Sequence, residues 1–428
     1  MVRVNPLSFV LAGGRGLRLQ PLTLERAKPS VPFGASYRVI DFVLSNLYHS
    51  GMRKIHVLTQ YMSESLQEHL EDGWSRNFGK GSEEFLKVRP AMQGSDRGWF
   101  KGTADSLYQH LHLIDRGNHR NVDVFGADHI YLMDVSQMNG MHNEREADLT
   151  ISAIPVPIDL ARGNYGVLVV DEDWRLVSFQ EKPDEPVPMP GDPTRCLASM
   201  GNYVFRRPAL IEALVTDAGK TYTTDNDALR AGDRHDLTSH DIAHDLIRDM
   251  MKRDKRIFVY DFSKNEVPGV PAEQRGFWRD IGDLDQLYQA NMEVRDVKPL
   301  LNLYNPEWHI MTNVVTTTPS KTVHDGRALE SIVANGVIVS GSLVERSVVG
   351  YNCRVIDGSY VGDSLLLGDN NIGSGSRIRR AILDKGVCTP HGTVIGEDQS
   401  VDKARGFSFS DKGIPVVPKG YMFKQGSG

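Results

Sequence analysis

The sequence predicts an α/β domain built on a mostly parallel, mixed sheet, followed by a parallel β-helix. Strand-like and helix-like segments alternate over the first 130 residues, which is typical of parallel strands covered by helices on both faces. After residue 326 aliphatic residues recur about every six positions, and 17 of the 40 glycines lie in residues 326–428. We therefore expect an α/β domain over 1–295, a connecting segment over 296–325 and a β-helix over 326–428.

The elements of the α/β domain follow from short apolar runs and from amphipathic runs. The predicted strands are Ser8–Ala12, Lys54–Thr59, Val122–Phe125, Leu149–Ile154, Tyr165–Val170, Leu176–Gln180 and Asn202–Phe205. The predicted helices are Val39–Ser50, Ser63–Glu71 closed by Gly73, Thr103–Asp115 capped by Thr103, Pro208–Thr216 and Ile242–Lys252. Sheets of this kind bind ligands at the carboxyl ends of their strands, where Gly13, Gly14 and Asp128 fall.

The C-terminal period predicts which side chains point into the β-helix. Six-residue repeats stack as coils of a left-handed parallel β-helix, with one aliphatic side chain pointing inward from each face. The expected inward positions are Ile338, Val344, Val349, Val355, Val361, Leu367, Ile372, Ile378, Cys388 and Val394. A β-sandwich of alternating strands is the alternative interpretation, and the sustained period of six favours the β-helix.

Composition and charge exclude several classes of protein. The chain has 49 basic and 55 acidic residues, a net charge of −6, so neither a nucleic-acid partner nor a membrane partner is expected. Three cysteines in 428 residues rule out a disulfide scaffold. Met1–Leu7 is too short and too weakly apolar for a signal peptide, and no apolar run is long enough to span a bilayer. We expect a cytoplasmic protein.

A glycine-rich loop directly after the first strand is the first candidate site. Leu11 and Ala12 end the strand, and Gly13, Gly14 and Gly16 follow, with Arg15 among them. Glycines let backbone N–H groups approach phosphate oxygens closely. The loop is neither a Walker A motif nor a dinucleotide fingerprint, and taken alone a Gly-Gly turn after a strand is most often just a turn. Lys28 before Pro29 adds a cation that an extended backbone could bring to the same phosphates.

These residues belong to a longer pattern. Residues 11–46, LAGGRGLRLQPLTLERAKPSVPFGASYRVIDFVLSN, resemble the opening signature of the sugar-nucleotide pyrophosphorylases, above all the bacterial members that make ADP-glucose. Further matches follow in order along nearly the whole chain: Gly102–Asp105 (GTAD), Gly126–Asp134 (GADHIYLMD), Tyr165–Val167, Glu181–Pro183, Leu197–Phe205 (LASMGNYVF) and Phe277–Gly282 (FWRDIG). The resemblance implies a Rossmann-like nucleotidyltransferase domain before the β-helix.

The resemblance also implies a reaction and a set of site residues. AMP would pass from ATP to glucose 1-phosphate, giving ADP-glucose for glycogen or α-glucan synthesis, and pyrophosphate. Asp128 and Asp280 would hold Mg²⁺, and Arg15, Lys28 and Asp128 would be catalytic. The nucleotide would lie on Leu11, Ala12, Gly13, Gly14, Gly16, Gly102 and Thr103. Glucose 1-phosphate would lie on Phe100, Gly166, Glu181, Lys182 and Ser199. From its sequence context, Asp280 could instead pair with Arg279 or cap a helix that begins near Asp283.

Departures from the family pattern leave alternatives open. Phe100 stands where relatives carry tyrosine, and His244 replaces a lysine. A catalytically weak regulatory subunit is therefore an alternative. A pyrophosphorylase for another nucleotide is a second one, because the choice of base depends on a few loop contacts. The resemblance implies small-molecule effectors. Glu25 and Ser36 replace cations that many relatives use to bind a sugar-phosphate effector, so activation by fructose bisphosphate is not expected. The resemblance further implies a homotetramer. His240 and His244 are interpreted as residues near a helix start and not as zinc ligands.

Overall fold

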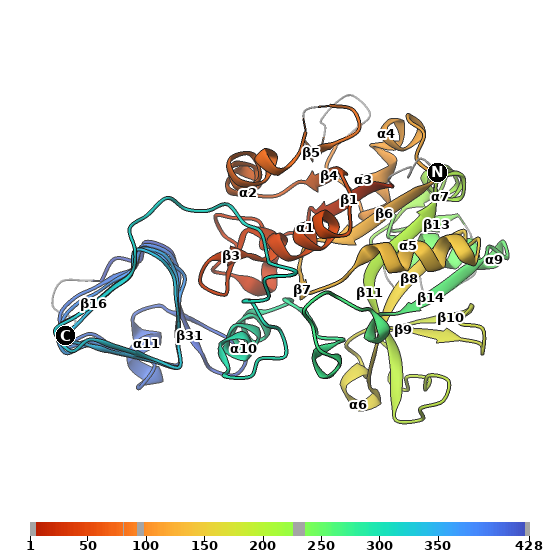
Figure 1. Cartoon of the computed structure of the whole chain (residues 1–428). Helices are drawn as coiled ribbons and strands as arrows, with labels where there is room; N and C mark the ends of the chain where they lie inside the picture. The colour runs from red at the N-terminus through yellow and green to blue at the C-terminus, as the bar shows by residue number, and fades with distance from the viewer. Residues whose placement is uncertain (1–5, 80, 92–97, 226–235, 424–428) are drawn as a thin grey trace.

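The computed structural model describes residues 6–79, 81–91, 98–225 and 236–423, and it has the predicted two-part architecture (Figure 1). The α/β part, drawn from red to green, lies beside a blue β-helix with a triangular cross-section. Residues 1–5, part of the N-terminal segment that we judged unlike a signal peptide, lie outside the described residues. None of the helices in the described residues is long and apolar enough to cross a membrane.

A nine-stranded mixed sheet forms the centre of the α/β part. Its main path runs β10-β9-β11-β6-β1-β4-β5, and β8 joins β11 to β14. Strands β5, β4, β1 and β6 are parallel, whereas β11 runs antiparallel to β6, β8 and β9. The strands are β1 (Leu7–Ala12), β4 (Lys54–Thr59), β5 (Phe85–Pro90), β6 (Asn121–Gly126), β8 (Leu149–Pro157), β9 (Gly166–Val170), β10 (Leu176–Glu181), β11 (Arg195–Arg206) and β14 (Ile257–Asp261).

The register of the parallel strands places their carboxyl ends at one edge. Ala12 of β1 lies opposite Thr59 of β4, and Leu11 lies opposite Gly126 of β6. Side chains of β1 alternate between two cores, because successive strand residues point to opposite faces of a sheet. Phe9 packs into one core and Val10 into the other. The loops that follow these three strands therefore meet at one place.

Helices cover both faces of this sheet. One face is covered by α1 (Val39–His49) and α5 (Val135–Glu144). The other face is covered by α3 (Thr103–Tyr108), α4 (Leu111–Asp115), α7 (Arg207–Ala218) and α9 (Ile247–Lys252). The other α-helices of the described residues are α2 (Glu64–His69), α6 (Ile158–Ala161), α10 (Leu284–Arg295) and α11 (Gln399–Ala404). Gly51, with φ +82°, follows α1 as the sequence predicts.

Two predicted helix ends are wrong. Gly73 does not close a helix, because the π-helical turn η3 (Leu70–Trp74) continues through it. A Cβ at Gly73 would lie 2.4 Å from Cα of Asn313. The missing side chain of this glycine therefore allows the connecting segment to pack closely against η3. Thr103 does not cap one long helix either. Gly102 is the N-cap of α3, and the helical run breaks before α4 at His110, so the Thr103 hydroxyl is left for a tertiary contact described below.

Three sheets form the faces of the predicted left-handed β-helix, and their strands pair in parallel except for β30, which runs antiparallel to β31. Their orders are β16-β19-β22-β25-β28, β17-β20-β23-β26-β29 and β18-β21-β24-β27-β31-β30. The first strands are β16 (Lys321–Val323), β17 (Arg327–Leu329) and β18 (Ile332–Val333), and β31 (Pro415–Val417) is the last. The strands between are β19 (Ile338–Ser340), β20 (Leu343–Glu345), β21 (Val348–Val349), β22 (Arg354–Ile356), β23 (Tyr360–Gly362), β24 (Leu365–Leu366), β25 (Asn371–Ile372), β26 (Arg377–Arg379), β27 (Ile382–Leu383), β28 (Cys388–Thr389), β29 (Val394–Ile395) and β30 (Ser408–Phe409).

Four predicted inward positions are displaced by one residue. Val339, Leu366, Thr389 and Ile395 point into the coil, in place of Ile338, Leu367, Cys388 and Val394. Cys388 is exposed, and the buried Leu367 packs outside the coil. The spacing between successive inward residues is not constant: it is five residues from Val361 to Leu366, which explains the error at Leu367, and six from Leu366 to Ile372. The other predicted inward residues, such as Val344 and Ile378, are fully buried.

The connecting segment contains no helix or strand over 296–320, but its hydrogen bonds fix it to α1. Thr312 Oγ1 donates to the buried Asp41 carboxylate at 2.7 Å, and Met311 N donates to Ser45 Oγ at 2.9 Å. One apolar cluster then joins α1, α10 and the β-helix, with Phe42 and Leu365 among its members. The division at residues 295 and 326 stays a prediction. The contacts show that the β-helix packs directly on the domain that carries the candidate site.

Candidate active site

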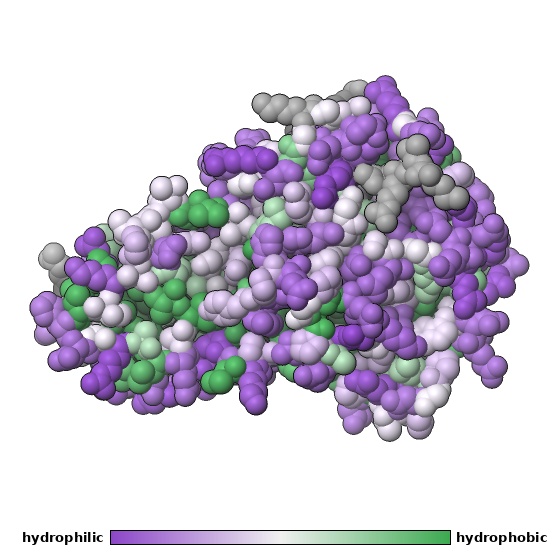
Figure 2. All heavy atoms as spheres, viewed as in Figure 1, coloured by the Kyte–Doolittle hydropathy of each residue, from purple (hydrophilic) through white to green (hydrophobic). Residues whose placement is uncertain are grey.

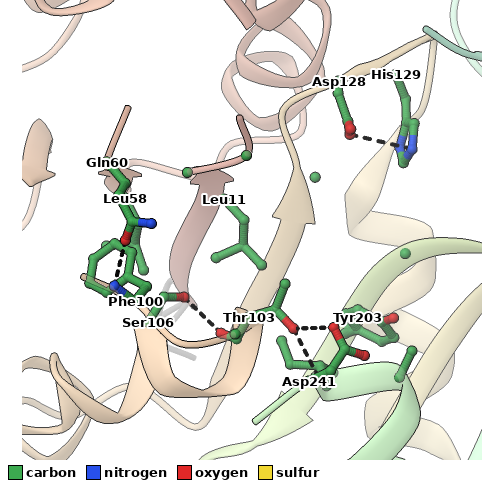
Figure 3. Close-up of a pocket in the computed structure, with 17 residues that line it drawn as sticks. Leu11, Leu58, Gln60, Phe100, Thr103, Ser106, Asp128, His129, Tyr203 and Asp241 are labelled. Carbon is green, nitrogen blue, oxygen red and sulfur yellow. Dashed lines mark hydrogen bonds and ion pairs between the residues drawn. The ribbon is translucent and has the colours of Figure 1, made fainter. Parts of the chain in front are cut away.

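A cavity of about 390 Å³ lies at the carboxyl ends of β1, β4 and β6 (Figure 3). It forms there because parallel strands end together and their following loops diverge. Seven residues expected from the sequence line it: Leu11, Gly13, Gly14, Phe100, Gly102, Thr103 and Asp128. The predicted nucleotide loop and one predicted metal ligand therefore share a single hollow.

Lys28, Asp128 and Asp280 meet at one side of this cavity. Lys28 Nζ lies 2.7 Å from Oδ2 of Asp128 and 3.5 Å from Oδ1 of Asp280. Asp128 follows β6, Lys28 begins the short turn η2 (Lys28–Ser30), and Asp280 ends β15 (Trp278–Asp280). Strand β15 pairs with β7 (His129–Tyr131), and this register places Asp280 opposite His129. Three distant parts of the chain thus supply one charged cluster.

Electrostatics ties the ammonium to the two carboxylates. Burial lowers the pKa of Lys28, but the charges of Asp128 and Asp280 outweigh it, and the net direction is upward. Burial raises the pKa of the Asp128 carboxyl, yet Lys28 and His129 reverse that effect, and the net direction is downward. Both members of the pair therefore keep their charges at neutral pH.

The two carboxylates fit a divalent cation. In the described residues, Asp128, His129 and Asp280 form the one group whose ligand atoms lie within 4.8 Å of one another. Asp280 Oδ1 is buried and accepts no hydrogen bond, as expected of an oxygen that awaits a cation. The sequence left open that Asp280 pairs with Arg279 or caps a helix. Instead Arg279 pairs with Glu293 at 2.9 Å, and Asp283 caps α10.

The glycine loop adopts a conformation that glycine favours. Gly16 has φ +62° and begins the turn η1 (Leu17–Leu19), and its carbonyl accepts the Thr23 hydroxyl at 2.8 Å. Ala12 is buried beneath the loop. The structure does not bring Arg15 to the carboxylates. Its guanidinium lies 4.8 Å from the centre of the Tyr61 ring, and Tyr61 stacks on Trp99.

The opposite wall depends on close backbone approach. Thr103 Oγ1 donates to Asp241 at 2.9 Å and accepts from Ile242 N at 2.8 Å (Figure 3). A Cβ at Gly102 would lie 2.3 Å from the carbonyl oxygen of His240, so only glycine fits there. His240 precedes the turn η5 (Ile242–Leu246) and Asp241 caps it, so the two histidines flank a helix start as predicted.

The remaining predicted sugar residues lie on β9, β10 and β11 and do not line this cavity. Gly166 and Glu181 face each other across β9 and β10. Glu181 and Lys182 are exposed, and Lys182 has a positive φ of 45°. Ser199 lies on β11, and its hydroxyl accepts from Gly201 N at 3.4 Å. The structure therefore places these residues together at the next strands of the sheet.

Several lining residues were missed from the sequence. Tyr203 and His129 lie inside the motifs quoted above, but no role was assigned to them from the sequence. Gln60 lies directly after β4, just as Gly13 lies directly after β1. The rule that ligands bind at strand ends was sufficient to find Gln60. Its Oε1 accepts from Phe100 N, which fixes the aromatic wall. Asp241 was considered only as a residue between His240 and His244. Its contact with Thr103 could not be predicted, because the two residues are 138 positions apart in the sequence.

Comparisons with known proteins agree with this geometry. The family model described as nucleotidyl transferase matches residues 7–297, and the model described as GlmU-like, C-terminal hexapeptide matches residues 316–417. A glucose-1-phosphate adenylyltransferase of Geobacter metallireducens is 44% identical over 96% of this chain and 97% of its own length. Another, of Thermus thermophilus, is 45% identical over 99% of this chain and 100% of its own length.

Proposed function

The chain belongs to the family of glucose-1-phosphate adenylyltransferases, and on this premise we propose that its cavity transfers AMP from ATP to the phosphate oxygen of glucose 1-phosphate. The products are ADP-glucose, for glycogen or a related α-glucan, and pyrophosphate. One observation carries the proposal. A lysine held between two carboxylates stands beside a glycine-rich loop at the carboxyl ends of parallel strands. Both substrates are anions, so such a reaction depends on positioning and on charge neutralisation.

Asp128 and Asp280 are the residues that would hold Mg²⁺. Magnesium binds through one or two carboxylates together with phosphate oxygens and waters, which matches two aspartates beside an open cavity. When bound, the ion supplies charge stabilisation for the phosphate oxygens. Its two carboxylates also keep Lys28 in place, because the ammonium contacts both of them.

Lys28 and Arg15 would act on the phosphates of ATP. Lys28 needs little movement, since it already lies at the cavity's edge beside Asp128. Arg15 must leave the Tyr61 ring, and an exposed cation–π contact is worth only about 0.5–1 kcal/mol. A triphosphate offers charge-assisted hydrogen bonds that are stronger than this contact. The exposed position of Arg15 therefore suits a residue that closes on its ligand.

The nucleotide and the sugar phosphate would occupy the two sides of the site. Gly102 and Thr103 form the wall that we assign to the nucleotide base. Gly166, Glu181, Lys182 and Ser199 come from β9, β10 and β11, and we assign them to glucose 1-phosphate. Glu181 offers acceptors for sugar hydroxyls and Lys182 a cation for the phosphate. Phe100 lines the cavity without a hydroxyl, so it offers the sugar phosphate an apolar contact.

Pyrophosphate release from ATP and glucose 1-phosphate with Mg²⁺ tests the proposal. We expect release that requires both substrates and the metal, and that is lost in Asp128→Asn. No release from folded wild-type protein would contradict the proposal. The same assay with ATP, UTP, dTTP and GTP compares kcat/KM among nucleotides, and a preference for another nucleotide would favour a different pyrophosphorylase. Trace activity with tight binding of ADP-glucose would favour a regulatory subunit.

We also propose a cytoplasmic homotetramer whose activity responds to small-molecule effectors. Support for assembly comes from apolar side chains at the junction of the connecting segment and the first coil. Val297 is 85% exposed and Leu300 52% exposed, and both line one hollow with Ile332. The space-filling view shows green, apolar groups on the β-helix half of the molecule (Figure 2). Sedimentation of the full chain tests the tetramer, and a glycolytic metabolite panel tests the effectors.

A further inference from the structure

His129 lines the cavity beside the two carboxylates but has no role in the reaction as described so far. Its Nε2 lies 3.4 Å from Oδ1 of Asp128 and 3.9 Å from Oδ1 of Asp280. Figure 3 shows the imidazole directed toward the Asp128 carboxylate. The other carboxylate oxygen of Asp128, Oδ2, forms an ion pair with Lys28. The oxygen that faces His129 is therefore the one left for a cation.

The ring is held in this position by its surroundings. The centre of the ring lies 5.1 Å from the centre of the Trp278 ring. His129 is also the first residue of β7, and the pairing of β7 with β15 places it opposite Asp280. A Cβ at Gly126 would lie 3.3 Å from Cε1 of His129, and a Cβ at Gly201 would lie 3.8 Å from the same atom. Two glycines thus leave the Cε1 edge of the ring close to the cavity, which both of them line.

The hydrogen bonds of the cluster leave one carboxylate oxygen without a partner, since Asp280 Oδ1 is buried and accepts no hydrogen bond. Of the two ring nitrogens of His129, Nε2 is the one that lies near the carboxylates, whereas Nδ1 is buried without a partner. An imidazole nitrogen and two carboxylate oxygens, one atom from each residue, lie within 4.8 Å of one another. That donor set suits a divalent cation of the first transition row better than a pure oxygen site does.

We propose that His129 Nε2 is a third protein ligand to the divalent cation that Asp128 and Asp280 hold. The proposal rests on the proposed function only for the presence of the metal. The imidazole Nε2 would donate its lone pair to the cation, and the proton would then reside on Nδ1, which is buried without a hydrogen-bond partner. The nitrogen ligand strengthens binding of Mn²⁺ more than binding of Mg²⁺, since Mg²⁺ prefers oxygen.

Pulsed electron paramagnetic resonance on the full-length protein with Mn²⁺ alone tests this proposal. We expect nitrogen hyperfine coupling to bound Mn²⁺ that changes when histidine is labelled with ¹⁵N. The coupling disappears in His129→Gln and persists in His391→Gln, a control at an exposed histidine of the β-helix. If His129→Gln does not fold, as judged by circular dichroism, His129→Asn replaces it.

Metal affinity provides the second measurement. We expect Mn²⁺ to bind at least about tenfold more weakly to His129→Gln, with a smaller change for Mg²⁺. Mn²⁺ bound without nitrogen coupling, coupling that survives in His129→Gln, or no Mn²⁺ binding at all would overturn the proposal. AMP transfer is measured on the same preparations. AMP transfer without nitrogen coupling would contradict only the assignment of His129 as a metal ligand. Nitrogen coupling without AMP transfer would contradict only the proposed function.

Discussion

The ammonium of Lys28 lies 2.7 Å from Oδ2 of Asp128, although the two residues are 100 positions apart in the sequence. This contact joins the segment after the glycine loop to the end of β6. It also places one positive group next to two negative ones, because Asp280 Oδ1 lies 3.5 Å from the same ammonium.

Loss of the Lys28 charge should slow the reaction strongly. Lys28→Met is expected to lower kcat by about 10²–10³, since a preorganised charge no longer stabilises the transition state. The measurement is pyrophosphate release under saturating substrates. Lys403→Met, on the exposed face of α11, serves as the control and should keep wild-type kcat. A Lys28→Met enzyme within tenfold of wild type contradicts this role.

Asp280 should determine the metal requirement. Asp280→Asn is expected to raise the Mg²⁺ concentration for half-maximal activity by about tenfold or more, because a carboxylate ligand is lost. Activity is measured across a Mg²⁺ titration at fixed ATP. Asp411→Asn, an exposed aspartate on the β-helix, should leave the titration unchanged. An unchanged midpoint in Asp280→Asn would exclude Asp280 as a ligand.

Gly102→Ala should distort the wall made by Thr103. The new Cβ would meet backbone atoms of His240, which cannot rotate away as a side chain could. We expect destabilisation of about 1–3 kcal/mol, as for other overpacked sites, together with a higher KM for ATP. Gly98→Ala is the matched control, since a Cβ there has no neighbour within 4 Å. Equal KM values in the two variants would remove Gly102 from the nucleotide site.

The buried pair between Arg26 and Asp384 should hold the β-helix to the catalytic domain. The two side chains are 6% and 1% exposed and lie 2.7 Å apart. Asp384→Ala leaves a buried guanidinium without its partner, which typically lowers the free energy of unfolding by about 3–5 kcal/mol. Denaturant unfolding measures this change. Lys419→Gln removes the neighbouring surface pair with Glu25 and should not change the unfolding midpoint. A similar midpoint for both variants would contradict the prediction.

Asp123 should make stability depend on pH. Burial raises the pKa of Asp123 to about 7, although Asn139 and Ser8 donate hydrogen bonds to its carboxylate. In the unfolded chain the pKa of an aspartate side chain is about 3.9. Between these values the folded state binds more protons, so its stability is full below about pH 4 and declines as pH rises through about 7.

The amide of Asp123→Asn has no such proton to lose. Its unfolding midpoint should exceed that of the wild type at pH 8 and approach it at pH 5. Thermal unfolding at one scan rate, repeated at both pH values, measures the difference. Asp411→Asn should show no pH-dependent difference from the wild type. A gap between Asp123→Asn and wild type that is the same at both pH values would show that Asp123 does not titrate in this range.

Local pattern was sufficient for much of the fold. The strand Lys54–Thr59 is predicted with the observed bounds, because β-branched and apolar residues there are bounded by polar ones. The family and the nucleotidyltransferase activity predicted from the collinear motifs are confirmed by the comparisons. Six of the predicted inward residues of the β-helix are correct, including Val349, which follows Val344 by only five residues. The other four are each wrong by one residue, because the spacing of the coil varies between five and six residues and a single repeat does not reveal which applies.

The sequence by itself determined the order of elements, the glycine loop after β1 and the residue types that phosphate chemistry needs, since these depend on neighbouring positions. Tertiary structure alone decided which of those residues meet. Asp280 reaches Asp128 through the pairing of β15 with β7, whereas Arg15 rests on Tyr61. Gly73 makes room for Asn313 instead of ending a helix. The physical reason is the same in each case: packing between segments far apart in the chain leaves no periodic signal in either segment.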